Sequence, residues 1–290
     1  MASAPAVVVV NHDAGPALSD FVTSLTGESV GAVVVVDNAS TDTSLESLPA
    51  APGLTVLRLT ANVGYGAGVN RGLAVTDADL VLVSNPDVAV HRGALAALAE
   101  AFVADPTLAI AGPAIVDEEG TRYPSARRFP SYGAAAGHAL LGLLRPGNRF
   151  TRRYQMVDLD PAAPTAVDWV SGACFMARRR ALQELGGFDE SYFMYVEDLD
   201  LCWRARRAGW QVAYVPTATV THLQGLSTGR RPYRMLWAHH RSAYHFASRT
   251  AQGWWRLLLP GVAVVLAARL AVSSAREFLG RRHKKAGPAD

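Results

Sequence analysis

Carboxylate side chains directly follow apolar runs at several places in the chain. Asp37 follows a run of valines, Asp87 comes shortly after a second apolar run, and the adjacent Glu197 and Asp198 follow an aromatic one. A parallel α/β sheet binds its ligands beyond the carboxyl ends of its strands, so acids at these positions are expected to meet around one ligand. Such acids suit a nucleotide, a divalent metal ion and a proton acceptor. Together they outline a site for glycosyl transfer.

The strand-end acid Asp37 is followed by Asn38, and it can accept hydrogen bonds from a ribose hydroxyl or a base imide. A dinucleotide-binding fold uses an acid at the same place, but it also requires G-x-G-x-x-G after the first strand. The corresponding turn here reads Asn11-His12-Asp13-Ala14-Gly15, which argues against that fold. The glycine run Gly64-Tyr65-Gly66-Ala67-Gly68 follows the third predicted strand, where it serves either phosphate contact or close packing of a helix.

The turn Ser84-Asn85-Pro86-Asp87 offers a carboxylate at the end of the fourth predicted strand. Mg²⁺ and Mn²⁺ prefer oxygen ligands, and Mg²⁺ commonly takes one or two carboxylates together with substrate phosphates. Asp87 is therefore a candidate metal ligand, although Asn-Pro-Asp is also an ordinary turn sequence. His222 ends a late predicted strand and joins Asp87 as a candidate ligand of metal or diphosphate; a lone histidine is more often structural.

Glu197 and Asp198 begin a predicted helix at 197–208, next to the aromatic residues Phe193 and Tyr195. Acids in the first turn of a helix are ordinary partners of its dipole. A carboxylate beside an aromatic surface is also a suitable general base for a sugar hydroxyl, because partial desolvation raises its pKa. Both interpretations stay open for each acid at this stage.

The first 115 residues alternate short apolar runs with helix-like stretches. Strands are expected at Val7–Val10, Val33–Val36, Thr55–Leu59, Leu80–Val83 and Ala109–Gly112. Helices are expected between them at Ala17–Leu25, from Ser40, from Gly64 and at Gly93–Val103. Continuous apolar strands separated by helices predict a mostly parallel sheet covered on both faces, so the expected fold class is α/β.

Residues 117–165 break this pattern, because they are rich in Pro, Gly and Arg and show little periodicity. We expect a long, partly helical insertion there, since loops of this length are usually functional or disordered. Val167–Arg178 then predicts a return to strand with a bend at Ser171-Gly172. Short strands at Val212–Val215 and Thr219–Thr221 follow the helix at 197–208.

An apolar segment, Leu257–Leu270, lies between Trp254-Trp255-Arg256 and a basic tail. It is shorter than the roughly 20 residues of a transmembrane helix, and Pro260 and Arg269 interrupt it. The aromatic and cationic anchors favour an interfacial or re-entrant segment, so residues 251–290 are expected to form a membrane-associating helix and basic tail. An ordinary C-terminal core helix is the alternative.

The composition limits the classes of function. With 50% hydrophobic and 18% charged residues, the chain is globular and fits one large domain with an appendage. The net charge is only +3, and the basic tail suits an anionic membrane surface, or simple solvation, better than base recognition, so no nucleic-acid partner is expected. Cys174 and Cys202 are too few for a disulfide framework and indicate buried thiols in a reducing compartment. The N-terminal apolar run, Ala6 to Val10, is too short for a secretory signal.

The order of these motifs is more specific than any one of them. Along the chain they are Asp37, Asn62-Val63-Gly64-Tyr65-Gly66, Asn85-Pro86-Asp87, Trp169–Ala173, Gly187-Phe188-Asp189-Glu190, Phe193–Asp198 and His222. In this order they resemble the family 2 glycosyltransferases of the GT-A fold, and most closely their rhamnosyltransferase branch. The resemblance implies a GT-A domain at 1–250, with a nucleotide-binding half at 1–115 and an acceptor and catalytic half at 116–250.

The resemblance also implies a role for each site residue. Asp198 matches the family's catalytic base, and Asp87 matches the last acid of its metal-binding D-x-D pattern, with His222 completing the metal or diphosphate site. Asn85 stands where that pattern has its first acid. The donor nucleotide side would be formed by Asn11, Asp37, Asn38, Asn62, Gly64 and Asn85. The acceptor side would be formed by Arg127, Arg128, Trp169, Ser171, Gly172 and Glu197.

For function, the resemblance implies an inverting transfer of L-rhamnose from dTDP-rhamnose to a polyprenyl-diphosphate-linked N-acetylglucosamine in cell-wall polysaccharide synthesis, with Mg²⁺ or Mn²⁺ as cofactor. Such a lipid-linked acceptor would place the protein on the cytoplasmic face of the cell membrane, as a peripheral or monotopic protein. Two other interpretations stay open. One is the same fold with UDP-galactofuranose or a UDP-hexose as donor. The other is a non-catalytic nucleotide-sugar-binding scaffold at the membrane, against which the presence of both Asp87 and Asp198 argues.

Overall fold

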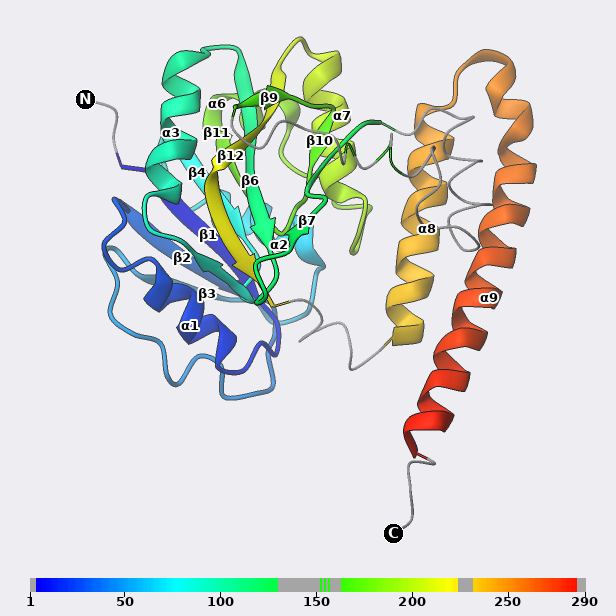
Figure 1. Cartoon of the computed structure of the whole chain (residues 1–290), viewed down its shortest axis with the longest axis horizontal. Helices are drawn as coiled ribbons and strands as arrows, with labels where there is room; N and C mark the ends of the chain where they lie inside the picture. Colours follow the sequence, from blue (N-terminus) through cyan, green and yellow to red (C-terminus); the bar gives the residue numbers. More distant parts are fainter. Residues whose placement is uncertain are drawn as a thin grey trace.

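The computed structural model describes residues 4–129, 152, 154, 156, 163–223 and 232–285 of the 290-residue chain. A mixed sheet forms its centre, in the strand order β3-β2-β1-β4-β11-β6-β12-β5 (Figure 1). Its strands, with β7 and β9 paired beside that path, are β1 (Ala6–Asn11), β2 (Ala32–Asp37), β3 (Thr55–Arg58), β4 (Leu80–Ser84), β5 (Val88–Val90), β6 (Leu108–Val116), β7 (Arg122–Tyr123), β9 (Thr165–Ala166), β11 (Cys174–Arg178) and β12 (Gln211–His222). A small second sheet pairs β8 (Ala126–Arg127) with β10 (Trp169–Val170).

The helices precede, follow and flank these strands. They are α1 (Ala17–Ser24), α2 (Tyr65–Leu73), α3 (Ala94–Ala104), α6 (Arg179–Leu185), α7 (Glu197–Arg207), α8 (Pro232–Thr250) and α9 (Leu259–Lys285), with a 3-10 helix η1 (Gly253–Leu258) before the last. α1 and α3 contribute to the hydrophobic cluster on one face of the sheet, and α2, α6 and α7 contribute to the cluster on the other.

The sheet contains both parallel and antiparallel strand pairs. β1 runs parallel to β2 and β4, and β2 runs parallel to β3. β11 is antiparallel to both β4 and β6, whereas β12 is parallel to β6. The expected α/β fold with a mostly parallel, mixed sheet is therefore confirmed. Strands from before and after residue 115 lie next to each other in this sheet, so the two halves of the chain share one core.

Alternating valines build both faces of the sheet. In β1, Val8 and Val10 belong to one buried cluster, and Val7 and Val9 belong to the other. Fully burying one such side chain stabilises the fold by roughly 1.5–3 kcal/mol relative to leaving it exposed. Because both faces are covered, the polar residues of these strands come at their carboxyl ends, where β1 ends at Asn11.

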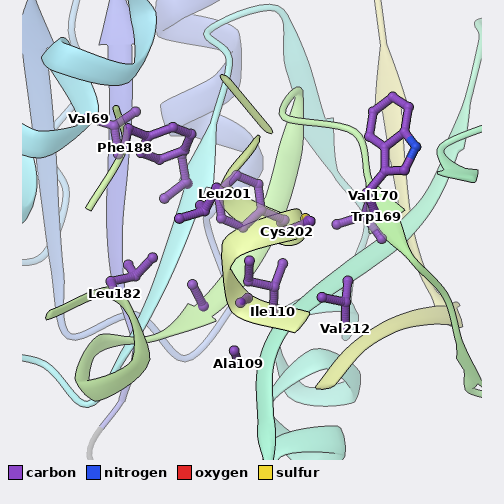
Figure 2. Close-up of a cluster of buried hydrophobic side chains, with 14 of the residues drawn as sticks. Val69, Ala109, Ile110, Trp169, Val170, Leu182, Phe188, Leu201, Cys202 and Val212 are labelled. Carbon is purple, nitrogen blue, oxygen red and sulfur yellow. The ribbon is translucent and has the colours of Figure 1, made fainter. Parts of the chain in front are cut away.

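The hydrophobic core also fixes the helix that begins with the paired acids. Leu201 and Cys202 of α7 lie in one buried cluster with Ile110, Val170 and Val212 (Figure 2). These partners come from β6, β10 and β12, so α7 is held against strands of both sheets. Both cysteines are free and buried, as the sequence predicted.

The helix expected from Ser40 does not form. Residues 38–54 adopt turns and irregular structure instead. Side chains in and next to this stretch bond the local backbone: Asp42 Oδ1 accepts from the Ser44 N–H at 3.1 Å, and Asp37 Oδ1 accepts from the Ser40 N–H at 3.3 Å. Serine and aspartate side chains that bind the local backbone compete with helix formation, which explains the wrong prediction.

The second half differs from expectation in smaller ways. The two short strands expected at Val212–Val215 and Thr219–Thr221 are parts of β12, whose register against β6 shifts between Val215 and Thr219. Pro216 lies in that interval and has no N–H to give to the ladder. The strand and bend at Val167–Arg178 are confirmed as β10, a turn and β11. Neither β5, α6 nor α8 was expected. Most of the insertion at 117–165 lies outside the described residues.

α8 and α9 pack against each other beside the sheet domain (Figure 1). The expectation that the C-terminal apolar segment is too short to span a membrane is wrong, because Gly253–Leu279 passes by length and composition, with a mean hydropathy of 1.9. Pro260 lies in the first turn of α9, where its missing N–H is not needed, so it does not interrupt the helix. The apolar window is 0% buried, which excludes the alternative of a core helix. The basic side chains beyond residue 279 lie outside the described part.

Candidate active site

The carboxyl ends of β1 and β2 carry a buried polar cluster. Asn11 and Asp37 stand opposite each other in the register of these strands. Asn11 Nδ2 lies 3.3 Å from Asp37 Oδ1, 2.9 Å from Ser40 Oγ and 2.8 Å from Ser44 Oγ. The structure thus brings two predicted donor-side residues into contact. Sequence reasoning gave the serines no role, although Ser40 follows Asp37 closely in the same strand-end motif.

Asn38 holds the turn that precedes α2. Its Nδ2 donates to Asn62 Oδ1 at 3.1 Å and to Gly64 O at 3.0 Å, and its Oδ1 accepts from the Val63 N–H at 2.9 Å. Asn62 Oδ1 also accepts from the Gly64 N–H at 3.0 Å. These predicted donor-side residues therefore form one network, made of neutral amides, next to the strand-end acid.

The glycines around α2 allow close packing. Gly64 has a φ of +92°, and a Cβ there would lie 2.3 Å from Phe193 O. A Cβ at Gly72 would lie 2.5 Å from Cγ1 of Val8 in β1. Of the two interpretations of these glycines, the structure supports close packing, and phosphate contact stays a prediction.

Tyr65 connects the predicted donor-side turn to the segment before α7 and to the bend at Gly172. Its N–H donates to Phe193 O at 3.0 Å, and its hydroxyl donates to Gly172 O at 2.7 Å. Burial raises the pKa of Tyr65 well above its usual value, and the nearby carboxylates of Glu197 and Asp198 add to the rise. Sequence reasoning quoted Tyr65 inside a motif but gave it no role.

The turn after β4 places Asp87 against His222. Asp87 is 7% exposed, and His222 Nε2 lies 3.1 Å from its Oδ1. β12 brings the histidine there, because its last residue pairs with Val88 of β5. The N–H of Asn85 donates to Ala173 O at 2.8 Å. The two predicted metal ligands are therefore in direct contact, and Asn85 lies beside the bend between β10 and β11.

Asp87 and His222 fit a divalent cation as a partial ligand set. A carboxylate suits Mg²⁺ or Mn²⁺, and imidazole is a common metal ligand. Among the residues that the structure describes, no group of three or more His, Cys, Asp or Glu side chains could hold a metal ion. Because Mg²⁺ commonly completes a small protein ligand set with substrate phosphates and water, the pair suits a cation that arrives with a nucleoside diphosphate.

Asp198 is held by backbone amides at the start of α7. Its Oδ2 accepts from the Gly172 N–H at 2.7 Å, and its Oδ1 accepts from the Leu199 N–H at 2.8 Å. Burial raises the pKa of Asp198, and these hydrogen bonds together with the charge of Arg127 oppose the rise. A Cβ at Gly172 would lie 3.0 Å from Asp198 Cβ, so the bend and the acid are closely fitted.

Glu197 is the more strongly perturbed acid. It is 6% exposed, and its Oε2 has no hydrogen-bond partner among the described residues. Burial raises the pKa of Glu197 to about 8, and the neighbouring Asp198 adds to the rise. Two backbone N–H groups favour the charged form of Asp198, whereas the unpartnered Oε2 of Glu197 favours the protonated form of that acid. Their environments therefore give the two acids different protonation preferences, which the sequence alone did not distinguish.

Arg127 lies among aromatic rings on the second sheet. Its guanidinium carbon is 4.9 Å from the ring centre of Trp169 and 5.4 Å from that of Tyr123, whose hydroxyl accepts from Arg127 at 2.6 Å. Trp169 Nε1 donates to Arg128 O at 3.1 Å. β10 continues directly into Ser171 and the bend. The predicted acceptor-side residues are thus assembled beside Asp198.

The cavity between α2 and α6 is a different feature. It has a volume of about 380 Å³ and is lined by residues such as Asn70, Arg179 and Glu190. None of the predicted site residues lines it, and it holds neither of the paired acids. The predicted site residues, at the strand ends and the 171–173 bend, therefore lie outside this cavity.

The family model described as "Glycosyltransferase like family 2" matches residues 4–242. The chain therefore belongs to the family 2 glycosyltransferases and is an enzyme of that class. It is 42% identical over 264 residues to N-acetylglucosaminyl-diphospho-decaprenol L-rhamnosyltransferase of Mycobacterium tuberculosis (strain ATCC 25618 / H37Rv), and the match covers 86% of each chain.

Solved glycosyltransferase structures share the fold. GalNAc-T7 with UDP, GalNAc and Mn²⁺ has a TM-score of 0.58 at 18% identity, covering 85% of this chain and 50% of that one. The mannosyltransferase PcManGT from Pyrobaculum calidifontis, in complex with GDP-Man and Mn²⁺, has a TM-score of 0.56 at 17% identity, covering 99% and 81%. At these identities the likeness shows the fold alone, and it confirms the expected GT-A fold.

Proposed function

We propose that this chain transfers L-rhamnose from dTDP-rhamnose to N-acetylglucosamine carried on a polyprenyl diphosphate. The observation that carries the proposal is the 42% identity, over 86% of each chain, to the decaprenol-linked rhamnosyltransferase. The site supports it, because the carboxylate of Asp198 is held by the N–H of Gly172, one of the predicted acceptor-side residues.

Asp198 is the base in this proposal. It takes the proton of an acceptor hydroxyl while the hydroxyl oxygen forms a bond to the anomeric carbon of the donor sugar. The bond from that carbon to the diphosphate breaks on the opposite face, so the configuration inverts and the nucleoside diphosphate leaves. General base catalysis of this kind contributes roughly 10²–10⁴-fold to a rate.

The polar cluster at the ends of β1 and β2 binds the donor nucleotide. Asp37 accepts from a ribose hydroxyl or a base imide, and Asn38 shapes the turn that lies beside it. The donor-side set is Asn11, Asp37, Asn38, Asn62, Gly64 and Asn85. A Mg²⁺ or Mn²⁺ ion held by Asp87 and His222 would offset negative charge on the leaving diphosphate. The Mn²⁺ in both solved neighbours supports a divalent cofactor.

The acceptor sugar lies on the side of the second sheet. Arg127 lies in this region with its guanidinium carbon 4.9 Å from the ring centre of the buried Trp169, so it would set the charge and shape of the acceptor side. The acceptor-side set is Arg127, Arg128, Trp169, Ser171, Gly172 and Glu197. Its proximity to Asp198 supports this assignment, since the acceptor hydroxyl must reach the base.

The outer side of α9 supports a place at the membrane. Polar residues such as Arg269, Ser273 and Glu277 are half-buried on one side of the helix, whereas Val264 on the other side is 69% exposed. Every exposed residue from 257 to 275 is apolar, proline or glycine. This is the reverse of a helix that faces water, and a lipid bilayer is the environment that fits it.

α8 favours a hairpin that lies on the bilayer surface. It runs alongside α9 and carries Arg234, Arg241 and Arg249 (Figure 1). Each arginine at the centre of a bilayer costs about 2.5–3.5 kcal/mol on insertion scales, so a membrane-crossing α9 would separate from α8 or carry these charges with it. We therefore place the protein at the surface, peripheral or monotopic, on the cytoplasmic face where its free thiols stay reduced.

A donor panel tests the reaction. The full chain is incubated with N-acetylglucosaminyl-diphospho-lipid, Mg²⁺ or Mn²⁺, and each nucleotide sugar in turn, and the lipid product is weighed by mass spectrometry. A gain of one deoxyhexose from dTDP-rhamnose is expected. Transfer from UDP-galactofuranose or a UDP-hexose instead would keep the enzyme class and overturn the donor. Donor binding without transfer to any acceptor would favour the scaffold interpretation.

Flotation with vesicles containing anionic lipid tests the membrane surface. Val264→Asp introduces a charge on the exposed side of α9, and Val103→Asp introduces the same charge at a valine of α3 that is 74% exposed. Only the first is expected to lose vesicle binding. Equal binding by both variants, or membrane fractionation unchanged by removal of residues 254–290, would contradict the anchor.

A further inference from the structure

The segment that leads into α7 is strained. Tyr195 and Val196 have φ angles of +67° and +71°, a region that side chains, and β-branched ones above all, rarely adopt. Such a conformation persists only where the surrounding structure fixes it. These two residues immediately precede Glu197 and Asp198. The contacts that hold the segment therefore help to set where the proposed base lies.

Two helices hold this segment through its backbone. The Tyr65 N–H, at the start of α2, donates to Phe193 O at 3.0 Å. Ser242 Oγ, in the middle of α8, donates to Met194 O at 3.0 Å. The first contact belongs to the site described above. The second comes from the C-terminal hairpin, which has no part in the chemistry proposed so far.

A buried charge ties α8 to the first turns of α7. Asp200 is 0% exposed, and its Oδ2 accepts from Arg204 Nε at 2.6 Å. On α8, Arg249 Nε lies 3.9 Å from Asp200 Oδ1, and its guanidinium also pairs with Asp189. Arg204 is the hydrogen-bonded partner of Asp200, and Arg249 adds a second, longer ionic contact to the same carboxylate. Arg249 is thus a partner of a carboxylate that lies two residues beyond Asp198.

These contacts come from one side of α8. The residues that share this side, spaced i, i+3, i+4 and i+7, are Ser242, His245, Phe246 and Arg249. His245 Nε2 lies 3.0 Å from Ser191 Oγ, and the Phe246 ring meets the Trp203 ring edge-on at 6.2 Å between centres. One side of α8 therefore contacts residues 189–204, and the same helix also packs against α9.

We propose that Ser242 and Arg249 are positioning residues for Asp198, so that α8 belongs to the catalytic apparatus and does more than support α9. The proposal rests on the proposed function, because it takes Asp198 as the base. Ser242 holds the strained turn through Met194, and Arg249 contacts the segment before that turn through Asp189 and the first turn of α7 through Asp200. Because of these contacts, a shift of the α8–α9 hairpin would also shift the proposed base, Asp198.

The test compares Arg249→Met with Arg180→Met in the full chain. Arg180 forms an exposed pair with Glu184 at 2.9 Å on α6, so its replacement removes an ion pair without touching α7 or α8. A small misplacement of a catalytic group lowers the rate strongly, and Arg249→Met is expected to lower kcat about tenfold or more. KM for the donor should stay within about twofold, because this substitution leaves the donor side intact. Arg249→Lys, which keeps the charge, should recover part of kcat.

Amide hydrogen exchange at residues 193–198 gives a second readout that needs no substrate. It therefore separates failure of this inference from failure of the proposed function. Exchange should be faster than wild type in Arg249→Met and in Ser242→Ala, and unchanged in Arg180→Met. If Arg249→Met does not fold, Ser242→Ala, which removes a single hydroxyl, takes its place. Unchanged exchange at these amides, or a loss confined to donor KM, would overturn the proposal.

Discussion

The proposed donor side and the proposed catalytic turn, residues 195–198, differ in the kind of groups that form them. On the donor side, neutral amides bond one another and the backbone, as Asn38 does with Asn62 and Gly64 at 3.1 and 3.0 Å. At the catalytic turn, burial raises the pKa of both Glu197 and Asp198, and two residues of positive φ come just before them. A hydrogen-bonded neutral network stabilises a fold, whereas buried carboxylates and strained backbone reduce its stability.

The difference shows how this enzyme divides stability from reactivity. Donor binding needs a shape that is already formed, and a satisfied network supplies it. A base needs a desolvated carboxylate, which is retained at some loss of stability because function requires it. Substitutions on the two sides should therefore have separable effects: on folding and donor binding on one side, and on rate on the other.

Asp198→Asn is expected to have the largest effect, lowering turnover by roughly 10³-fold. The asparagine carbonyl can still accept from the Gly172 N–H, but it takes no proton from the acceptor. Donor binding, measured by calorimetry, should be unchanged because the donor-side network is untouched. Full turnover in this variant would refute the assignment of the base.

Gly64→Ala tests the contact between the two sides, with Gly93→Ala as its control. Both glycines are helix N-caps of positive φ, +92° and +82°, but a Cβ would meet Phe193 O at 2.3 Å at Gly64 and nothing within 4 Å at Gly93. Gly93, with a ψ of 0°, is in the left-handed helical region, and its replacement should cost about 1 kcal/mol of unfolding free energy. Gly64, with a ψ of 171°, is in a region essentially restricted to glycine, so its backbone angle alone should cost about 1–3 kcal/mol. Gly64→Ala should lose about 2 kcal/mol more through overpacking. Equal losses in chemical unfolding would show that the close approach carries no energy.

Asp87→Ala tests whether donor binding depends on a metal ion held by Asp87. The variant should bind the donor roughly tenfold more weakly than wild type when Mn²⁺ is present. Without metal the two proteins should bind the donor equally, because the base and ribose contacts remain. Calorimetric titrations with and without Mn²⁺ measure this difference. A metal dependence like that of wild type would exclude Asp87 as a ligand.

Glu197→Gln is expected to have the smallest effect and the opposite sign. The folded protein keeps the Glu197 proton up to about pH 8, whereas the unfolded chain releases it near the ordinary value of 4.5. Between these values the unfolded state binds fewer protons, so stability falls as pH rises through this window. Glutamine avoids that loss, and the variant's Tm should exceed that of wild type by roughly 5 °C at pH 8. The two Tm values should converge towards pH 4; a constant gap would contradict the raised pKa.

The placement of the proposed donor-side residues could largely be predicted from the sequence, because its signals are local. Asp37 and Asn11 end apolar runs, and parallel strands in register bring such ends together. Asp87 and His222 also lie near strand ends. Their contact depends on the pairing between β5 and β12, which the sequence did not predict. The helix expected from Ser40 failed because side-chain bonds to the backbone outweighed its periodicity.

The catalytic turn was only half predictable. Its acids were found, but the difference between them comes from tertiary packing: the Gly172 N–H donates to Asp198, while Glu197 Oε2 has no hydrogen-bond partner among the described residues. The hydroxyl of Tyr65 reaches Gly172 across 107 residues of chain, and no local pattern reports such a contact. The same holds for α8. The side of this helix that contacts residues 189–204 cannot be identified from the sequence, because those contacts are distant along the chain.

Both oxygens of Asp198 already accept a backbone N–H, from Gly172 and from Leu199. A further hydrogen can then approach only along the lone pairs that remain, and those directions are fixed by the peptide geometry of the bend and of the first turn of α7. With Asp198 as the proposed base, the direction from which an acceptor O–H can approach it is thus set by main-chain atoms.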